Sequence, residues 1–251
     1  MKILFIGDIV GKSGRDALAS YLPELRKDHH WDLCIANGEN AAGGKGLTES
    51  VAHDLLDLGI DIMTMGNHTW DNKEIFSFID SAPWLIRPCN YPVGTPGQGW
   101  IVKEVSGKRV GVINVAGQVF MNPLDCPFTA MDRVLAEMDV CDYYLVDMHA
   151  EATSEKLALA YYLDGRVGAV LGTHTHIQTA DERVLPNGTV YITDVGMTGA
   201  LISVLGMEVT PVVERFTTKL PRRFKAASGP GMVNAVWLDL DAQRIIRLQR
   251  P

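Results

Sequence analysis

The stretch from Gly172 to His176 constrains this chain more than any other, because it directly follows the apolar run Val167–Leu171. A short apolar run of this kind is typical of a buried strand. Residues two apart in a strand project from the same face, so His174 and His176 are predicted to point the same way at the strand's end. Two neutral imidazoles directed at one point suit a transition-metal ion. The alternative is a pair of histidines that bond to loop carbonyls.

Four other apolar runs end in side chains that can bind a metal, so the same design is repeated along the chain. These side chains are Asp8, Glu39, Asn40, Asn67, His68 and His149. In open α/β sheets, ligands bind at the carboxyl ends of the strands, so we expect the five strand ends to lie together. Oxygen and imidazole donors without cysteine suit Mn²⁺, Fe²⁺ or Zn²⁺.

Seven of these side chains are candidate metal ligands, which is more than one transition-metal ion usually takes from a protein. They are Asp8, Glu39, Asn40, Asn67, His149, His174 and His176. Two divalent ions that share Glu39 account for this number most simply. Iron and manganese fit the mixture of donors, and zinc is a further candidate. The sequence therefore predicts a centre of two transition-metal ions.

Predicted strands alternate with predicted helices along the chain, which favours an α/β fold with mixed strands. Helical spacing of apolar residues is found in four stretches: Leu18–Leu25, Val51–Leu58, Ile75–Ile79 and Val134–Met138. Turn residues predict hairpins across Ser106–Lys108 and Pro186–Gly188 and a closing hairpin within Val233–Leu248. No repeat, low-complexity tract or convincing linker is evident, so residues 1–251 are expected to form a single domain.

Local signals also predict where two of the helices begin. Thr48 is a candidate N-cap for the helix Val51–Leu58, and Gly59 is expected to end that helix. Ser13 and Asp16, which follows three residues later, form a candidate capping pair for the first helix. Both predictions depend on side-chain oxygens that accept hydrogen bonds from the first free N–H groups of a helix.

Composition excludes several classes of partner. The formal net charge of -7 argues against a protein that coats duplex nucleic acid, which needs clustered cations. No apolar run approaches the roughly 20 residues of a membrane helix, and Ile3–Ile6 is too short for a signal-peptide core. The four cysteines are widely spaced, which is typical of reduced thiols in a cytoplasmic protein. A small phosphorylated substrate is allowed, and the sequence leaves homo-oligomerisation open.

In their order along the chain, the strand-end motifs resemble those of the calcineurin-like metallophosphoesterases. The motifs are Gly7-Asp8, Gly66-Asn67-His68, His149 and Gly172-Thr173-His174-Thr175-His176. The resemblance covers about two-thirds of the chain. The sequence departs from the family pattern at two places. Val10 stands where the family has its first-strand histidine, and Asn37-Gly38-Glu39-Asn40 stands where it has Gly-Asp-x-x-Asp. In both departures the chain resembles a bacterial subfamily of 2′,3′-cyclic-nucleotide 2′-phosphodiesterases. The segments Gly7–Lys12 and Thr193–Met197 resemble that subfamily as well.

This resemblance implies a four-layer sandwich, with two mixed β-sheets flanked by helices. It also implies how the ligands divide between the ions. One metal would be held by Asp8, Glu39, Asn40 and His176, and the other by Glu39, Asn67, His149 and His174. Asn40 would then replace the missing first-strand histidine. The implied activity is hydrolysis of a phosphodiester, foremost a 2′,3′-cyclic nucleotide to a 3′-nucleotide.

The expected chemistry follows from such a centre. Two ions roughly 3.5–4 Å apart activate a bridging hydroxide, direct it at phosphorus and neutralise charge on the phosphoryl oxygens. His68 is adjacent to Asn67 and is not needed as a ligand, so it is a candidate general acid for the leaving oxygen. The alternative is that His68 only orients a ligand. The base is expected to lie against the loop Gly117–Phe128 or the segment Gly196–Gly231, neither of which carries a nucleotide motif.

Three other functions compete with the phosphodiesterase. Gly7–Ser13 nearly forms a P-loop, but only three residues separate its glycines where four are required, so a nucleotide triphosphatase is disfavoured. Amidohydrolases also use His-x-His, but at their first strand rather than late in the chain. A metal-binding regulatory or scaffold protein with vestigial activity stays open, because a fold does not guarantee turnover. The basic cluster within Lys219–Lys225 is interpreted as a solvated face.

Overall fold

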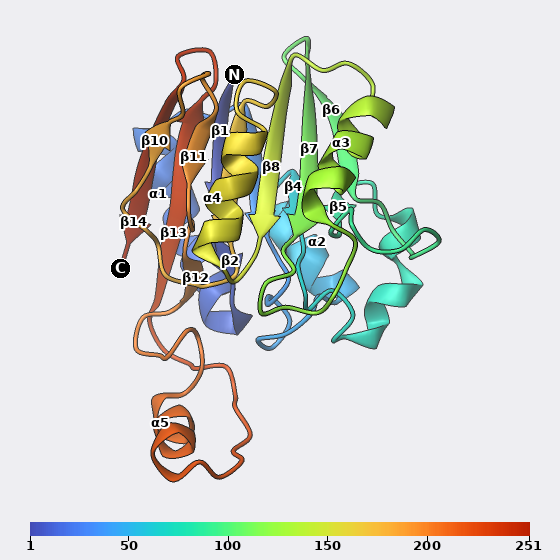
Figure 1. Ribbon diagram of the computed structural model, residues 1–251. Helices are drawn as coiled ribbons and strands as arrows, with labels where there is room; N and C mark the ends of the chain where they lie inside the picture. Colours follow the sequence, from blue (N-terminus) through green and yellow to red (C-terminus); the bar gives the residue numbers. More distant parts are fainter.

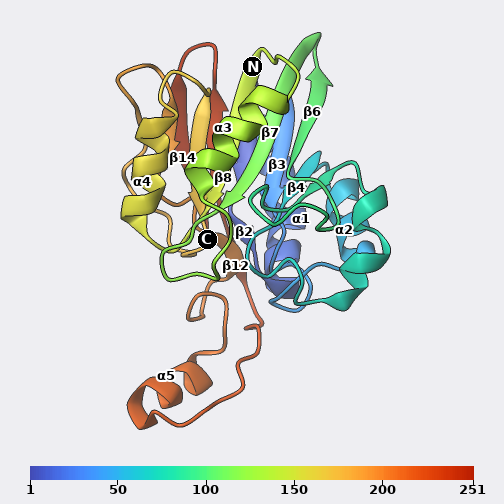
Figure 2. The same cartoon turned by 45° about the vertical axis from the view of Figure 1, so that its right-hand side comes forward.

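The computed structural model describes residues 1–251 and has four layers, in which two mixed β-sheets pack face to face between two pairs of helices (Figures 1 and 2). Helices α1 (Gly11–Asp28) and α2 (Glu49–Asp57) cover the outer face of the larger sheet. Helices α3 (Pro127–Glu137) and α4 (Thr153–Tyr162) cover the outer face of the smaller one. This confirms the mixed α/β fold that the sequence pattern predicted and the four-layer sandwich that the family resemblance implied.

The larger sheet has eight strands in the order β2-β12-β13-β1-β3-β4-β5, with β14 paired to β13. Their bounds are β1 Lys2–Ile6, β2 Asp8–Ile9, β3 Leu33–Asn37, β4 Ile62–Thr64, β5 Leu85–Ile86, β12 Met197–Ala200, β13 Gly231–Asp239 and β14 Arg244–Arg250. Strands β1, β3, β4 and β5 run parallel, and β13 is antiparallel to β1. The predicted closing hairpin is the pair β13 and β14.

The smaller sheet has six strands in the order β10-β11-β9-β8-β7-β6. Their bounds are β6 Trp100–Val105, β7 Lys108–Ala116, β8 Tyr143–His149, β9 Ala169–Thr173, β10 Arg183–Val184 and β11 Val190–Ile192. Strands β7, β8, β9 and β11 run parallel, whereas β6 and β10 join as the antiparallel hairpins that the sequence predicted.

The central strands are continuous apolar runs because both of their faces are buried. In β1, Ile3 and Phe5 pack into the core between the two sheets, whereas Leu4 and Ile6 pack against the layer of α1 and α2. Because both faces of these strands pack against apolar side chains, polar side chains are found mainly at the strand ends. The strand ends are therefore where functional side chains are placed.

Two local predictions at helix ends can be compared with the structure. Thr48 caps α2, since its side chain accepts a hydrogen bond from the N–H of Val51 at 3.3 Å. The predicted capping pair of α1 is wrong, because that helix begins at Gly11 without a side-chain cap. Ser13 instead donates to the carbonyl of Ala227 at 3.1 Å, a tertiary contact that local sequence does not reveal.

The stretch around Ile75–Ile79 differs from its prediction as an α-helix. It forms two short 3₁₀ segments, η1 (Lys73–Ser77) and η2 (Ile79–Ser81). Asn72 caps the first of these by accepting the N–H of Glu74 at 3.0 Å. The apolar residues at helical spacing are too few to distinguish the two kinds of helix, because i and i+3 neighbours share a face in both.

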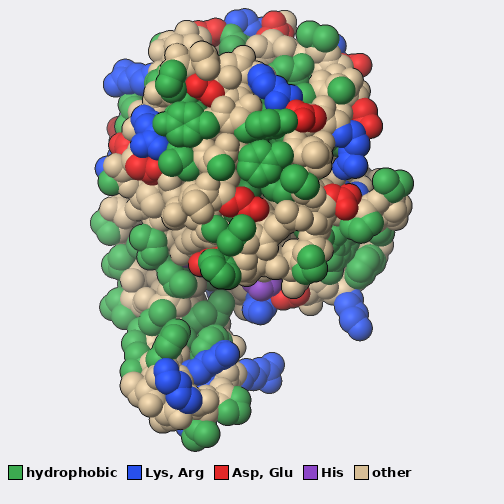
Figure 3. Space-filling view, in the orientation of Figure 1, with side chains coloured by type: hydrophobic (Ala, Val, Ile, Leu, Met, Phe, Trp, Pro, Cys, Tyr) green, Lys and Arg blue, Asp and Glu red, His purple; other side chains and the backbone are tan.

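Residues 201–227 leave the sandwich after β12 and return to β13 as a projecting arm that carries helix α5 (Val209–Thr218) (Figures 1 and 2). Figure 3 shows basic side chains gathered on this arm. The predicted cluster is exposed, as expected for a solvated face: Lys219, Arg222, Arg223 and Lys225. No helix in the structure has the length and apolar character needed to cross a membrane.

Candidate metal centre

The predicted ligands follow the carboxyl ends of β1, β3 and β4 in one sheet and of β8 and β9 in the other. The arrows of β7 and β8 point to this edge of the sandwich, from which the arm extends (Figure 1). All seven candidate ligands and His68 are joined here by short contacts, most of which cross between the sheets. The expectation that five strand ends meet is therefore confirmed.

Two carboxylates, Asp8 and Glu39, lie wholly buried at the middle of this cluster. Oε1 of Glu39 is 3.1 Å from Nε2 of His149, and Oε2 accepts the backbone N–H of His68 at 2.9 Å. Oδ2 of Asp8 accepts the backbone N–H of His174 at 3.2 Å, whereas its Oδ1 accepts no hydrogen bond. The ion pairs of both carboxylates involve only histidines. Buried carboxylates without a lysine or arginine partner are costly, so the site fits a divalent cation.

The pKa values show how strongly these groups interact in the protein without metal. Burial raises the pKa of Asp8 to about 6, against the charges of His176 and His149. Burial also acts to raise the pKa of Glu39, but the charge and hydrogen bond of His149 outweigh it and lower the pKa to about 2. Burial lowers the pKa of His149, but the charge of Glu39 reverses this and raises it to about 9. In the protein without metal, Glu39 and His149 therefore form a buried ion pair.

The ring of His149 is oriented from behind by a chain of buried hydrogen bonds. Thr173 Oγ1 donates to Oδ1 of Asp147 at 2.6 Å, so the same hydroxyl oxygen accepts from Nδ1 of His149 at 2.9 Å. Nε2 of His149 consequently faces the site, where it lies 2.9 Å from Oδ1 of Asn67. Fixing the tautomer in this way is how proteins present a histidine to a metal. Asp147 and Thr173 were not found by sequence reasoning, although Asp147 lies two residues before His149 on the same strand face.

His174 and His176 reach the site by a different geometry from the one predicted. Their φ angles are +98° and +66°, so they lie in a turn beyond β9 and do not extend the strand. The prediction that a shared strand face makes them converge is therefore wrong, yet both face the site. His174 Nδ1 lies 3.1 Å from His149 Nε2, and His176 Nε2 lies 3.9 Å from Asp8 Oδ1. Burial and the charge of His149 lower the pKa of His174 to about 3, which keeps it a neutral donor.

A buried ion pair holds this turn in place. Lys156 Nζ donates to Oδ2 of Asp194 at 2.7 Å, and both side chains are wholly buried. The same carboxylate oxygen accepts the backbone N–H and the hydroxyl of Thr175 at 3.0 and 2.8 Å. Because Thr175 separates the two histidines, this pair fixes the left-handed backbone that directs them inward. Sequence reasoning missed Lys156, which lies in the middle of helix α4.

His68 is positioned by its own carboxylate partner. Its Nδ1 lies 2.9 Å from Oδ2 of Asp71, which leaves Nε2 free toward solvent, and about a quarter of the side chain is exposed. Gly66 lets the backbone before His68 pass close to two candidate ligands. A Cβ at this position would lie only 2.3 Å from the ring of His149 and 2.5 Å from Glu39 Oε2. Asp71 is a further residue that the sequence did not single out, although it lies only three positions beyond His68.

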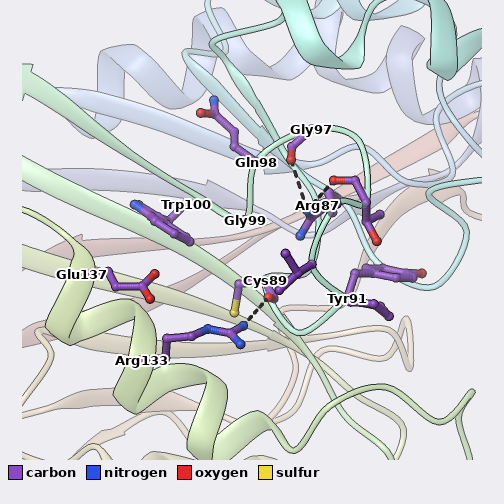
Figure 4. A pocket seen from close by; sticks show the side chains of 13 residues that line it. Arg87, Cys89, Tyr91, Gly97, Gln98, Gly99, Trp100, Arg133 and Glu137 are labelled. Atoms are coloured by element: carbon purple, nitrogen blue, oxygen red, sulfur yellow. Dashed lines mark hydrogen bonds between the residues drawn. The ribbon is translucent and has the colours of Figure 1, made fainter.

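A cavity of about 300 Å³ opens over the cluster. Its lining residues include Glu39, Asn40, Lys45, His68, Glu151, His174, His176, Leu205 and Met207. A larger cavity, of about 620 Å³, shares no residue with it and is shown in Figure 4. There the guanidinium of Arg87 donates to four backbone carbonyls, and Arg133 donates to the carbonyl of Cys89. Both guanidinium groups are thus used to stabilise the backbone of a loop, and we place the chemistry at the smaller cavity, which the candidate ligands line.

Most of the backbone N–H groups of the near P-loop after β1 are already bonded within the protein. The backbone N–H groups of Asp8, Val10 and Gly11 donate to the carbonyls of Gly196, Thr198 and Asn40, at 3.0, 2.8 and 2.9 Å. A phosphate cradle needs such N–H groups free and directed at the ligand. These bonds count further against the nucleotide triphosphatase alternative.

Comparison with known proteins adds to this geometry. A sequence model of the YmdB-like protein family matches residues 4–250. A 2′,3′-cyclic-nucleotide 2′-phosphodiesterase of Bacillus subtilis (strain 168) is 52% identical over 253 residues, covering 100% of this chain and 96% of the relative. A solved structure described as a novel phosphatase of Mycoplasma pneumoniae has a TM-score of 0.93 at 33% identity, covering 100% of this chain and 93% of that one. A 5′-nucleotidase precursor of Thermus thermophilus, with a TM-score of 0.53 at 16% identity over 76% of this chain and 48% of its own, shares the fold.

Proposed function

Because the chain belongs to the YmdB-like protein family, we propose that it is a metal-dependent phosphodiesterase that opens 2′,3′-cyclic nucleotides to 3′-nucleotides. Family membership confirms the resemblance that the strand-end motifs indicated. The observation that carries the proposal is the pair of buried carboxylates, Asp8 and Glu39, which face histidines and have no lysine or arginine partner. The activity named for the Bacillus subtilis relative supports the substrate class.

The donor atoms of the site fit two divalent ions. Asp8, Glu39, Asn40 and His176 would hold one, and Glu39, Asn67, His149 and His174 would hold the other. One ligand atom from each of Glu39, His149 and His174 already lies within 4.8 Å of the others. When bound, such ions activate water and neutralise the charge on phosphoryl oxygens. Imidazole and carboxylate donors suit manganese, iron or zinc.

The protein's own contribution to bond cleavage is assigned to His68. Its Nδ1 is bonded to Asp71, so its Nε2 is the nitrogen that faces the cavity and can pass a proton to the leaving 2′-oxygen. Through this contact Asp71 fixes the orientation of the ring. The backbone N–H of His68 donates to Glu39, which ties the acid to the same carboxylate that both ions would share.

A second candidate function is a metal-binding regulatory or scaffold protein with vestigial turnover. The same ligands would serve it, but the His68–Asp71 pair would have no task, because a purely structural metal site needs no general acid. Turnover of a 2′,3′-cyclic nucleotide that disappears with a chelator and returns with Mn²⁺ supports the enzyme. Metal binding without turnover supports the scaffold.

Metal loading is expected to release protons. Because Glu39 raises the pKa of His149 to about 9, the imidazolium is the main form at neutral pH without metal, and the ion must displace its Nε2 proton. The apparent affinity should therefore rise roughly tenfold per pH unit for each proton displaced, up to about pH 9. Calorimetric titration with Mn²⁺ in buffers of different ionisation enthalpy counts the protons. An affinity that does not change with pH below that value contradicts the assignment of His149 as a ligand.

Substrate preference is expected to depend on the strain of the cyclic phosphate and on the leaving 2′-oxygen, which stays attached to the ribose. A 2′,3′-cyclic phosphate is a strained diester with a single negative charge, so 2′,3′-cyclic nucleotides should be hydrolysed faster than 3′,5′-cyclic nucleotides and simple monoesters. The product should be the 3′-nucleotide, identified by chromatography against both isomers. A 2′-nucleotide product, or a preference for monoesters, rejects this substrate class and leaves the metal centre untouched.

A further inference from the structure

Phe120 is unusual among the apolar side chains of this protein. It is 90% exposed, and its φ of +61° places it in the left-handed region of the backbone. A bulky aromatic residue is rare in that region, and exposing its ring to water is unfavourable as well. A conformation that is disfavoured on both counts persists only where its surroundings enforce it, and such positions gather at ligand sites.

Two buried side chains enforce the loop that carries Phe120. Both carboxylate oxygens of Glu155 accept backbone N–H groups, from Gln118 at 2.9 Å and from Val119 at 3.2 Å. At the other end of the loop, the side chain of Asn90 donates to the carbonyls of Ala116 and Asp125 at 2.8 and 2.9 Å. The loop is thus fastened on both sides of its tip, and the ring is presented outward by a rigid support.

The ring stands directly beside the candidate metal centre. Phe120 lines a cavity of about 290 Å³ together with Asn67, Met121, Asn122 and His174. Asn67 and His174 are two of the predicted metal ligands, and His174 also lines the cavity over the cluster. An aromatic face and the exposed amide of Asn122 therefore adjoin the place where a phosphate would be held.

We propose that Phe120 is a stacking platform for the nucleobase of the substrate. Stacking on this ring makes the site select nucleotides over cyclic phosphodiesters that carry no base. This inference rests on the proposed function. Bases stack on exposed aromatic rings, and such stacking tolerates every base because each has a π face. Asn122 offers both a donor and an acceptor to the edge of the base. The site consequently prefers base-bearing substrates while it discriminates little among the bases.

The test compares two substrates that contain the same five-membered cyclic phosphate, 2′,3′-cyclic AMP and the base-free glycerol 1,2-cyclic phosphate. In the metal-loaded Phe120→Ala protein, the ratio of their kcat/KM values should fall about 5- to 150-fold, the worth of one base stacked on an aromatic ring. The change should lie mainly in KM for the nucleotide. Phe120→Trp should restore the ratio. Tyr161→Ala, which removes another exposed aromatic ring near the C-terminal end of α4, is the matched control and should leave the ratio unchanged.

Two results would overturn the platform: an unchanged ratio in Phe120→Ala, or an equal loss on both substrates. Failure of the proposed function is recognised separately, because the native protein would then open neither cyclic phosphate. In that case the dissociation constant of 3′-AMP, measured by calorimetry on the metal-loaded protein, decides the matter. Weaker binding by Phe120→Ala than by the native protein keeps the platform, and equal binding rejects it.

Discussion

Glu39→Ala is expected to lose both metal ions and to reduce phosphodiester hydrolysis by at least about 10³-fold. Glu39 is the buried carboxylate that lies 3.1 Å from His149 on one side and accepts the N–H of His68 on the other. Deleting a ligand that two ions share removes several kcal/mol of the charge stabilisation that the ions give to the transition state. Each 1.36 kcal/mol lost lowers the rate tenfold. Metal analysis of the purified variant gives the ion count directly.

Two comparison variants sharpen this experiment. Asn67→Ala should mainly weaken one of the two ions, because Asn67 contacts His149 but neither carboxylate in the side-chain hydrogen bonds of the site. Glu137→Ala removes an exposed glutamate that lines the unrelated cavity and should keep both ions and full activity. Full occupancy in Glu39→Ala would show that Glu39 does not bridge the ions.

His68→Ala should keep both ions and lose roughly 10²- to 10⁴-fold in turnover of 2′,3′-cyclic nucleotides, the usual contribution of a general acid. The side chain of His68 forms its hydrogen bond with Asp71 and with none of the candidate ligands, so metal content is expected to be unchanged. A nitrophenolate leaving group needs no proton, and the loss should therefore shrink for nitrophenyl phosphodiesters. Steady-state rates on both substrate types measure the difference.

Asp71→Asn tests the partner of His68 in the same assay. It should cause a smaller loss than His68→Ala with the same dependence on the leaving group, because it weakens the support of the ring while leaving the imidazole in place. His53→Ala, at an exposed position on α2, is the matched control and should leave all rates unchanged. Equal losses on good and poor leaving groups would count against His68 as the acid.

The strand pattern and the identity of the polar strand ends were predictable from the sequence. Apolar runs such as Ile3–Ile6 are buried on both faces, so they stand out without knowledge of their partners. Parallel strands deliver their carboxyl ends to one edge, which is why Glu39 and His149 could be assigned to one site although they lie on different sheets. The hairpin turns and the cap at Thr48 were predictable because their signals are local.

Supporting residues of the site were not predictable in this way. Asp147 and Lys156 act through hydrogen bonds between different elements, and neither lies in a distinctive local pattern. Thr173 and Asp194 lie within motifs that resemble the family, but nothing local indicates the contacts that they make. Asp71 carried only the weak signal of its spacing from His68. The prediction of the capping pair at Ser13 failed for the same reason, since a carbonyl far along the chain took its hydroxyl.

The sequence by itself determined which donors stand at the strand ends, because burial on both faces of a strand leaves polar residues no other place. Only the tertiary structure decided how His174 and His176 face the site. Alternation along a strand predicted one shared face, whereas the buried pair of Lys156 and Asp194 holds Thr175 within a turn whose left-handed backbone directs both rings inward. The projection of Phe120 was decided in the same way, by Glu155 and its hydrogen bonds to the loop. Backbone conformations of high energy are set by the contacts that enforce them, and those contacts are distant in sequence.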